Sequence, residues 1–379
     1  MAVDRRSFLA KSLAAGAGLV TATSASAAEI PGAESWNSEP AIRKGDEKLL
    51  KIGGVFGLWS HMSSSWWRYF NPPEGFARAT GMRITHVWCV DRECGKRLAE
   101  RYDAELVETY DGMVGKVDGM FIDDFFATPF MPELSLPYLN AGIPCFFDRP
   151  MASGMKGVRT VLDASSRTGT PFMASSAYEY LKEVEVAKLR LARIGKISAY
   201  EARNSAGNVY QYALHGLWFT LKVMGVDVER ITHRTDDPTN APGVTLLEHG
   251  TKDSRFYGTI HHSRLRDIMC SVKAYGSDGV MESTCTVDGR VWNRDVFTYL
   301  EMMHAFERMV LTKTAPESLE YVEAKCRIYL SMLYSVFAKN GATVDVAALP
   351  EDWDVGFPEG FSRSYGDDVI NAYRRVLGK

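Results

Sequence analysis

The feature that most constrains the fold is a regular alternation between residues 51 and 175. Short apolar runs alternate there with amphipathic segments. Strands separated by helical segments favour βαβ units and a parallel, doubly wound sheet. The expected strands are Ile52–Gly57, Ile84–Val90, Asp118–Ile122, Ile143–Phe147 and Pro171–Ala174, and the expected helices are Cys94–Tyr102, Pro132–Asn140 and Gly157–Arg167.

The pattern changes near residue 175, without a flexible linker. A helix is expected from about Glu179 to Arg193, ending at Gly195. Alternating stretches joined by turn residues then predict an open, largely antiparallel sheet. Its expected strands are Ile197–Arg203, Val244–His249, Arg255–His262, Ile268–Tyr275 and Gly279–Thr286, with helices at Leu214–Met224, Phe297–Leu311 and Leu319–Phe337. The fold class is therefore an α/β domain over residues 48–175 and an α+β domain over residues 176–379.

Composition limits the class of protein. The chain has 379 residues, 46% hydrophobic and 24% charged, which is typical of globular proteins and long enough for two domains. Its net charge of −3 and the lack of a basic stripe argue against nucleic acid or an anionic membrane as the main partner. Six cysteines without a CxxC pair are expected to be buried small side chains rather than a disulfide framework.

The first 27 residues resemble a twin-arginine signal peptide. Arg5-Arg6 precede Phe8-Leu9, an Ala/Gly-rich apolar stretch follows, and Ala25-Ser26-Ala27 fits a cleavage site. This predicts export of the folded protein by the twin-arginine machinery to the periplasm or the medium. The alternative is a basic, disordered start of a cytosolic enzyme. Residues 28–47 would form a loose lead-in.

The order and spacing of several landmarks resemble the Gfo/Idh/MocA (glucose–fructose oxidoreductase and inositol dehydrogenase) family over nearly all of the mature chain. These landmarks are Lys51-Ile52-Gly53, Asp91-Arg92, Asp118, Ala141-Gly142-Ile143-Pro144, Asp148-Arg149-Pro150, Ile194–Ile197, His215 before Gly225, and Ala274–Gly279. The resemblance implies a Rossmann domain for NAD or NADP. It also implies a second domain that contacts the substrate and forms a homo-oligomer through its sheet.

The dinucleotide motif departs from the family. Gly57 can serve a tight turn, but no GxGxxG is present, and Phe56, Leu58 and Trp59 would crowd a phosphate. By the resemblance, Asp91 would bind the ribose hydroxyls, or Arg92 a 2′-phosphate. The alternative is a solvated pair at a strand end. The full set of implied cofactor contacts is Gly57, Leu58, Asp91, Arg92, Asp124, Asp148 and Pro150.

Two adjacent carboxylates follow the expected strand Asp118–Ile122. Asp123 and Asp124 stand near the place where the family has an apolar residue and a Thr-Pro, and Thr128-Pro129 follows a little later. Both acids together would repel a pyrophosphate unless a cation or sugar hydroxyls lay between them. They could instead point one inward and one outward.

The implied catalytic residues also depart from the family. Arg149 replaces a lysine; it can orient or stabilise an oxyanion but is a poor general acid. His215 matches the catalytic histidine and suits proton transfer from a sugar hydroxyl. Gln211 stands where an aspartate would orient that histidine. Structural alternatives are an ion pair for Arg149 and a core position for His215.

Aromatic and histidine residues supply the remaining candidates. Tyr178 and Tyr210 are substrate candidates by position, and Trp59 and His61 belong to an aromatic-rich segment that would suit stacking on a pyranose. A weaker alternative is a metal site built from Asp123, Asp124 and His61. His261 and His262 are neighbours in an expected strand, so at most one can face a cleft.

The leading hypothesis is thus a periplasmic oxidoreductase acting on a sugar or polyol with tightly held NAD or NADP. A second hypothesis is a dinucleotide-independent carbohydrate lyase, epimerase or hydrolase, either metal-assisted or metal-free. A third is a non-catalytic sugar-binding protein on the same fold, because fold alone does not decide among these functions.

Overall fold

The computed structural model describes residues 48–57, 60–62, 66–72, 78–124, 127–205, 207–239, 242–251, 254–263, 268–286, 295–357 and 366–379. All of them belong to one compact unit that spans Ala41–Lys379. The expected signal peptide and lead-in, residues 1–47, lie outside the described residues, as do Leu58 and Trp59. Among the residues described, no helix has the length and apolar character that a bilayer span needs.

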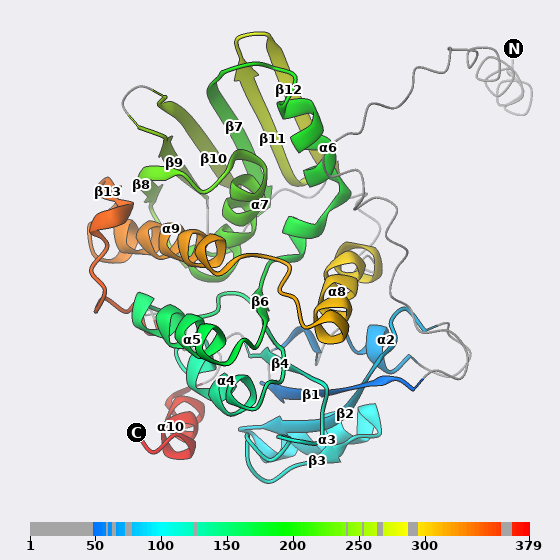
Figure 1. Cartoon of the computed structure of the whole chain (residues 1–379). Helices are drawn as coiled ribbons and strands as arrows, with labels where there is room; N and C mark the ends of the chain where they lie inside the picture. The colour runs from blue at the N-terminus through cyan, green and yellow to red at the C-terminus, as the bar shows by residue number, and fades with distance from the viewer. Residues whose placement is uncertain are drawn as a thin grey trace, which may run out of the picture. The chain divides into compact units, whose positions relative to one another are not determined.

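The first sheet has six parallel strands in the order β3-β2-β1-β4-β5-β6 (Figure 1). The strands are β1 (Leu50–Phe56), β2 (Met82–Cys89), β3 (Glu105–Leu106), β4 (Gly119–Asp123), β5 (Cys145–Phe147) and β6 (Phe172–Ala174). The helices after them are α2 (Trp67–Phe70), α3 (Arg92–Tyr102), α4 (Met131–Asn140) and α5 (Met155–Thr168). This confirms the predicted doubly wound sheet, whose strand order reverses between β1 and β4, where such folds bind ligands.

The second sheet has seven strands in the order β12-β11-β7-β10-β9-β8-β13. Its strands are β7 (Ile197–Ser205), β8 (Val228–Thr235), β9 (Gly243–His249), β10 (Phe256–Ser263), β11 (Ile268–Gly276), β12 (Gly279–Thr286) and β13 (Val344–Asp345). The pair β7 and β10 is parallel and the other paired neighbours are antiparallel, which confirms a largely antiparallel sheet.

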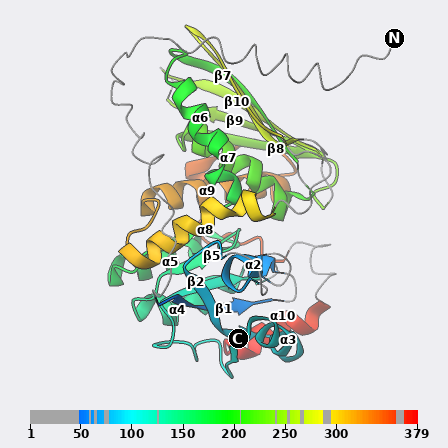
Figure 2. The same ribbon diagram turned by 90° about the vertical axis from the view of Figure 1, so that its right-hand side faces the viewer.

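Helices cover one face of this sheet (Figure 2). They are α6 (Lys182–Leu191), α7 (Leu214–Met224) and α9 (Leu319–Phe337), with the short helical turns η3 (Ala177–Tyr180), η4 (Val209–Ala213) and η6 (Val346–Ala348). The turn η4 is a π-helix that runs directly into α7. Such π-turns often occur at functional sites. Of the two adjacent histidines of β10, His262 is buried and His261 is exposed, as the strand pattern predicts.

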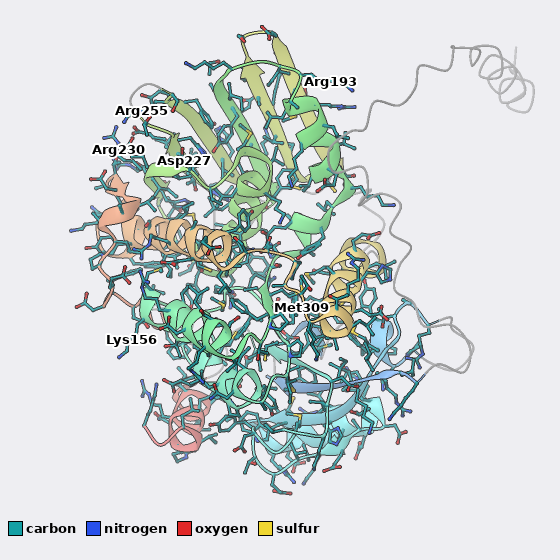
Figure 3. All side chains as sticks on the ribbon, viewed as in Figure 1. Lys156, Arg193, Asp227, Arg230, Arg255 and Met309 are labelled. Atoms are coloured by element: carbon teal, nitrogen blue, oxygen red, sulfur yellow. The ribbon has the colours of Figure 1, made fainter. Side chains whose placement is uncertain are left out.

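Two helices from the C-terminal part of the sequence pack on the first sheet. Phe306 of α8 (Asp295–Thr312) contacts Phe121 of β4, with ring centroids 4.5 Å apart. Met309, labelled on α8 in Figure 3, is buried in the same apolar cluster. Tyr373 of α10 (Gly366–Val376) stacks on Phe130, which precedes α4. Sequence patterning did not predict α10.

The cysteines form no disulfide: all six are free and buried. This confirms their predicted role as small core side chains.

Candidate functional site

His215 lies in the first turn of α7, pressed against the second sheet. Its neighbour Gly216 makes this approach possible, because a Cβ there would lie 2.3 Å from the Cβ of Asn204 on β7. His215 is consequently only 6% exposed. Both of its ring nitrogens have partners: Nε2 lies 3.1 Å from Nε of Arg149, and Nδ1 lies 2.6 Å from Oγ of Ser176.

The partners of His215 define its protonation. Arg149 can only donate, so Nε2 is the acceptor, and the ring proton of a neutral imidazole resides on Nδ1 and points to Ser176. Burial lowers the pKa of His215 well below its usual value, and the charges of Arg149 and His61 lower it further. The imidazole is therefore neutral near pH 7 and holds a basic lone pair at Nε2.

Arg149 and Asp148 follow β5 directly. The Nη1 group of Arg149 donates to Oδ2 of Asp148 at 3.3 Å, and the guanidinium lies 6.0 Å from the ring centre of Tyr212. The peptide between Arg149 and Pro150 is cis. The sequence-predicted pair Arg149 and His215 thus meets in space, although 66 residues separate them.

His61 meets the same carboxylate from the other side. Its Nδ1 lies 3.0 Å from Oδ2 of Asp148, and its ring stacks on Trp66 with centroids 4.4 Å apart. Burial raises the pKa of Asp148, but the charges of Arg149 and His61 and their hydrogen bonds outweigh burial, so the pKa lies below its usual value. Asp148 is therefore a charged bridge between His61 and Arg149.

Asp123 ends β4 and is fully buried. The backbone N–H groups of His61 and Met62 donate to its Oδ1 and Oδ2 at 3.3 and 2.8 Å. Burial and the nearby charge of Asp148 raise the pKa of Asp123 well above its usual value. Asp123 thus holds the turn after β1 in place and keeps a proton more readily than an ordinary aspartate.

The residues that could form the alternative metal site differ from those predicted from the sequence. Ligand atoms of His61, Asp123 and Asp148 lie within 4.8 Å of one another. Asp124, which the sequence placed in this set, points elsewhere, so the prediction of its role there is corrected. A cation among the three would share Oδ2 of Asp148 with the guanidinium of Arg149, and this positive neighbour disfavours it.

Asp124 fills the space over the glycine turn. A Cβ on Gly57 would lie 1.9 Å from Cγ of Asp124, so the carboxyl group rests directly on this glycine. The hydroxyl of Tyr373 on α10 donates to Oδ2 of the same carboxyl group. Gly57 was predicted to bring the backbone close to a phosphate. In the structure it brings the backbone close to Asp124.

The two predicted ribose contacts take part in local structure. Asp91 caps α3, since its Oδ1 accepts from the N–H of Cys94 at 2.8 Å. Arg92 donates to the carbonyl of Val107 at 3.1 Å and to Glu108 at 2.5 Å. Both side chains thus have partners within the protein at the strand end, and Arg92 is bonded to the segment around β3.

Two described residues after the glycine turn do not fit a dinucleotide pyrophosphate as they are arranged. A pyrophosphate needs free N–H groups at a helix start, but those of His61 and Met62 are bonded to Asp123. The crevice between the ends of β1 and β4 lies where dinucleotide-binding folds hold their ligand. Its N–H groups at His61 and Met62, however, are bonded to the side chain of Asp123.

A buried ion network positions the partners of His215. Ser176 and Glu179 form a capping box around η3. Glu179 accepts from Lys325 of α9 at 2.9 Å, and Lys325 also donates to Glu317 at 2.6 Å. Lys325 is fully buried, so this network fixes η3 against α9. The sequence analysis missed these residues, although Ser176 and Glu179 have the spacing of a capping box.

Of the remaining predicted site residues, Tyr178 contacts His215, whereas Tyr210 and Gln211 have other hydrogen-bond partners. Tyr178 stacks on His215 with ring centroids 4.8 Å apart. Tyr210 donates to the carbonyl of Gly356 at 3.3 Å and lies behind the site. The side chain of Gln211 accepts from Asn208 at 3.2 Å, so the predicted orienting role of Gln211 is corrected: Ser176 holds Nδ1.

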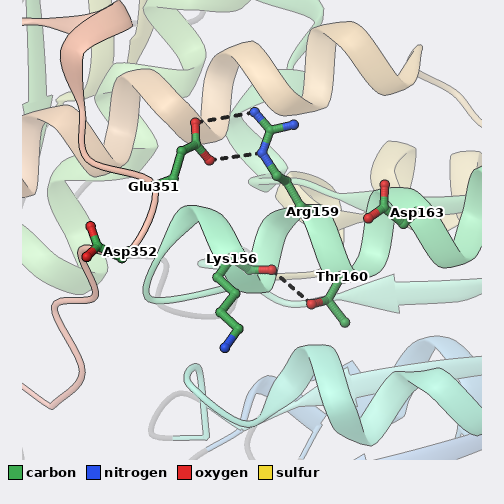
Figure 4. Close-up of a pocket in the computed structure, with 6 residues that line it drawn as sticks. All are labelled: Lys156, Arg159, Thr160, Asp163, Glu351 and Asp352. Atoms are coloured by element: carbon green, nitrogen blue, oxygen red, sulfur yellow. Dashed lines mark hydrogen bonds and ion pairs between the residues drawn. The ribbon is translucent and has the colours of Figure 1, made fainter.

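A shallow surface pocket lies apart from this site. It is lined by residues of α5 and of the segment after η6, and Arg159 binds Glu351 there through two hydrogen bonds of 2.9 and 3.3 Å (Figure 4). The pocket is lined by Lys156, Arg159, Thr160, Asp163, Glu351 and Asp352. It contains none of the sequence-predicted site residues.

Comparison with solved structures identifies the same fold in polyol dehydrogenases. Myo-inositol dehydrogenase from Lactobacillus casei, solved with NAD(H) and myo-inositol, matches with a TM-score of 0.66 at 14% identity, over 78% of this chain and 96% of that one. Scyllo-inositol dehydrogenase from the same organism, with NAD(H) and scyllo-inositol, matches with 0.64 at 14%, over 79% and 100%. Myo-inositol 2-dehydrogenase from Lactobacillus plantarum matches with 0.63 at 16%, over 79% and 99%.

No protein-family model matches the chain. The search of curated proteins likewise gave no match. The solved structures confirm the fold that the resemblance to the Gfo/Idh/MocA family implied.

Proposed function

We propose that this chain is an enzyme of the sugar and polyol oxidoreductase type, in which His215 moves a proton at a substrate hydroxyl. The observation that carries the proposal is the neutral, buried imidazole whose unprotonated Nε2 faces Arg149. Because burial and Arg149 lower the pKa of His215, the imidazole accepts a proton only when a substrate hydroxyl takes the place of Arg149 at Nε2.

The surrounding groups determine how that proton transfer proceeds. A substrate hydroxyl replaces Nε of Arg149 at Nε2 of His215, which then accepts the hydroxyl proton. Ser176 holds the opposite nitrogen, so the ring keeps its orientation. Arg149, still bound to Asp148, directs its remaining N–H groups to the substrate oxygen. Because Arg149 does not lose its proton in proteins, His215 is the only acid–base group of this pair.

The solved neighbours support NAD or NADP as the partner of a redox reaction and a polyol or sugar as substrate. The two Lactobacillus casei enzymes hold NAD(H) and an inositol. A bound nicotinamide would supply the hydride acceptor. Since the residues at the glycine turn do not fit the pyrophosphate as arranged, no hydride step is assigned to particular residues.

A second candidate keeps the same acid–base site without a dinucleotide. The bonds from His61 and Met62 to Asp123 favour it, because they fill the phosphate position from within. In that case His215 and Arg149 would serve a redox-silent reaction on a carbohydrate, such as an elimination.

Export, tight cofactor retention and self-association remain proposals. Residues 1–27 support export by the twin-arginine route to the periplasm. If the protein is exported, NAD or NADP would have to be carried tightly, because free cofactor is scarce there. Self-association through the second sheet is supported by the exposed Leu246, Tyr257 and Val280 on strands β9, β10 and β12.

The test compares the wild-type protein with His215→Asn. Each is incubated with inositols and hexoses, with NAD+, with NADP+ and without cofactor, while nicotinamide absorbance and sugar NMR spectra are followed. The proposal expects turnover in the wild type that His215→Asn abolishes. Cofactor reduction identifies the redox candidate, and a changed sugar without cofactor identifies the second. Equal turnover in both proteins would remove His215 from the reaction.

A further inference from the structure

We infer that Asp123 is an internal acceptor whose carboxyl group occupies the phosphate position of the dinucleotide crevice and acts as a built-in competitor of any dinucleotide. The inference does not depend on the proposed reaction, because it concerns binding alone. It assigns to Asp123 a role in excluding or weakening cofactor rather than in holding it.

The first step is the position of Asp123. It is the last residue of β4, directly beside the end of β1, where Phe56 pairs with it and the N–H of Gly57 donates to its carbonyl at 3.2 Å. The strand order reverses at this pair, and the glycine turn after β1 is where a pyrophosphate lies in such folds.

The second step is the identity of its donors. Phosphates at this point of the fold bind backbone N–H groups that follow the glycine turn. Here two successive N–H groups, those of His61 and Met62, reach the two oxygens of one carboxyl group at 3.3 and 2.8 Å. Asp123 is fully buried, so a phosphate from solution must displace its side chain to reach the same donors.

The third step is that a second side chain, Asp124, covers the backbone of the glycine turn at Gly57. Its carboxyl group lies on Gly57, where a Cβ would be 1.9 Å from Cγ. Tyr373 of α10 donates to that carboxyl group, and its ring stacks on Phe130 with centroids 5.2 Å apart. The close approach that a glycine provides for a phosphate is therefore used by a side chain of the protein.

The fourth step is charge. Asp148 lies near Asp123, and the positive groups around Asp148, Arg149 and His61, are already bound to it. A pyrophosphate would add two negative charges at an edge that already holds the charged Asp148. Charges of one sign in a buried site repel strongly.

The experiment removes the carboxyl group of Asp123 and measures binding. Wild type, Asp123→Ala and Asp123→Ser are titrated by calorimetry with NAD+, with NADP+ and with inorganic pyrophosphate, and thermal unfolding is followed with and without each ligand. We expect binding at least tenfold tighter in the two variants than in the wild type. Asp123→Ala should unfold at a lower temperature without ligand, because two buried N–H groups lose their partner, and pyrophosphate should restore much of the loss.

Asp124→Asn is the matched control. It removes one negative charge but keeps the size of the side chain over Gly57 and leaves the N–H groups of His61 and Met62 bonded to Asp123, so any gain in binding should be well below that of the Asp123 variants. An equal gain in Asp124→Asn would show that net charge, not occupation of the two N–H groups, controls affinity, and would overturn the inference. Unchanged binding in folded Asp123→Ala and Asp123→Ser would overturn it as well.

Hydrogen–deuterium exchange on the wild type covers the case in which the variants do not fold. The amides of His61 and Met62 should be protected without ligand and should gain no protection from NAD+. Added protection by NAD+ would show that the cofactor takes these donors and would overturn the inference. Loss of turnover in His215→Asn is a separate result, so the proposed function and this inference can fail independently.

Discussion

The two walls of the candidate site use buried polar groups in opposite ways. On the wall formed by η3, α7 and α9, two hydrogen bonds hold the imidazole of His215, one at Nε2 and one at Nδ1. On the wall formed by the ends of β1 and β4, hydrogen bonds lead from the backbone N–H groups of His61 and Met62 to Asp123. The first wall holds the imidazole of His215 in place for a reaction. On the second wall, Asp123 binds the backbone N–H groups that would otherwise be available to a ligand.

This difference shows how a fold can keep its architecture while its sites change separately. The sheet order places the end of β1 at the dinucleotide crevice whatever the side chains are. Whether a phosphate binds there depends on which acceptor reaches the N–H groups after the turn. Function is therefore argued from the polar contacts of each wall and not from the shared fold.

The largest expected effect is a loss of turnover when His215 is replaced. His215→Asn should lower turnover about 10²- to 10⁴-fold, the usual contribution of a general acid or base. The asparagine can still contact Ser176, so the thermal unfolding temperature should change little. His249→Asn, a change at another buried histidine that is bonded to Tyr200, is the control for turnover and should retain it. Similar losses in both variants would mean that fold damage, not proton transfer, explains the effect.

The next effect concerns the support behind His215. Lys325→Met should lower the free energy of unfolding by about 3–5 kcal/mol, because it leaves Glu179 and Glu317 buried without their shared cation. Urea unfolding measures the change. Lys222→Met is the matched control, since Lys222 is 19% exposed and pairs only with Glu317 among these acids. A smaller loss in Lys325→Met than in Lys222→Met would contradict the supporting role.

A smaller effect tests the opposite wall. Tyr373→Phe removes the hydroxyl that donates to Asp124 and should lower the free energy of unfolding by about 1–3 kcal/mol. Tyr210→Phe is the control, because its hydroxyl makes a longer bond of 3.3 Å to the carbonyl of Gly356. Urea unfolding of both variants gives the comparison. An equal or larger loss in Tyr210→Phe would show that Tyr373 does not hold Asp124 over Gly57.

The sequence predicted the elements of both walls where local signals were strong. The helix Leu214–Met224 was predicted with its observed bounds, because its apolar residues end at Gly225. The strand β8 was missed, because Glu229, Arg230 and Arg234 interrupt its apolar residues. The helix α10 was missed although Ile370 and Tyr373 bury one side of it.

The candidate site was predictable only in part, for a physical reason. Arg149 and His215 could be named because each has a local motif, and the structure places them 3.1 Å apart. The role of Asp123 depends on the register of β1 with β4 and on the path of the turn to Met62. Neither has a signal in the local sequence, so two adjacent acids could be noted but not assigned to different partners.

The smallest effect is a difference in pH dependence between buried histidines of the second sheet and Asp123. Burial lowers the pKa of His249 and of His233 to about 4, so each stays neutral in the folded chain while the unfolded chain takes up protons below about pH 6.5. Their contribution to stability is present above pH 6.5 and is lost as the pH falls toward 4. The slope is up to about 1.4 kcal/mol per pH unit for each histidine.

Asp123 should respond with the opposite sign. Its pKa is raised in the folded chain, first by burial and then by Asp148, so its contribution is present below the unfolded value near 3.8 and is lost as the pH rises through the folded value. Compared with the wild type, the free energy of unfolding measured in urea above pH 4 should therefore rise less with pH in His249→Gln and rise more with pH in Asp123→Asn. If both variants change the pH slope in the same direction, Asp123 does not have a raised pKa in the folded chain, and the electrostatic argument for the wall at the ends of β1 and β4 fails.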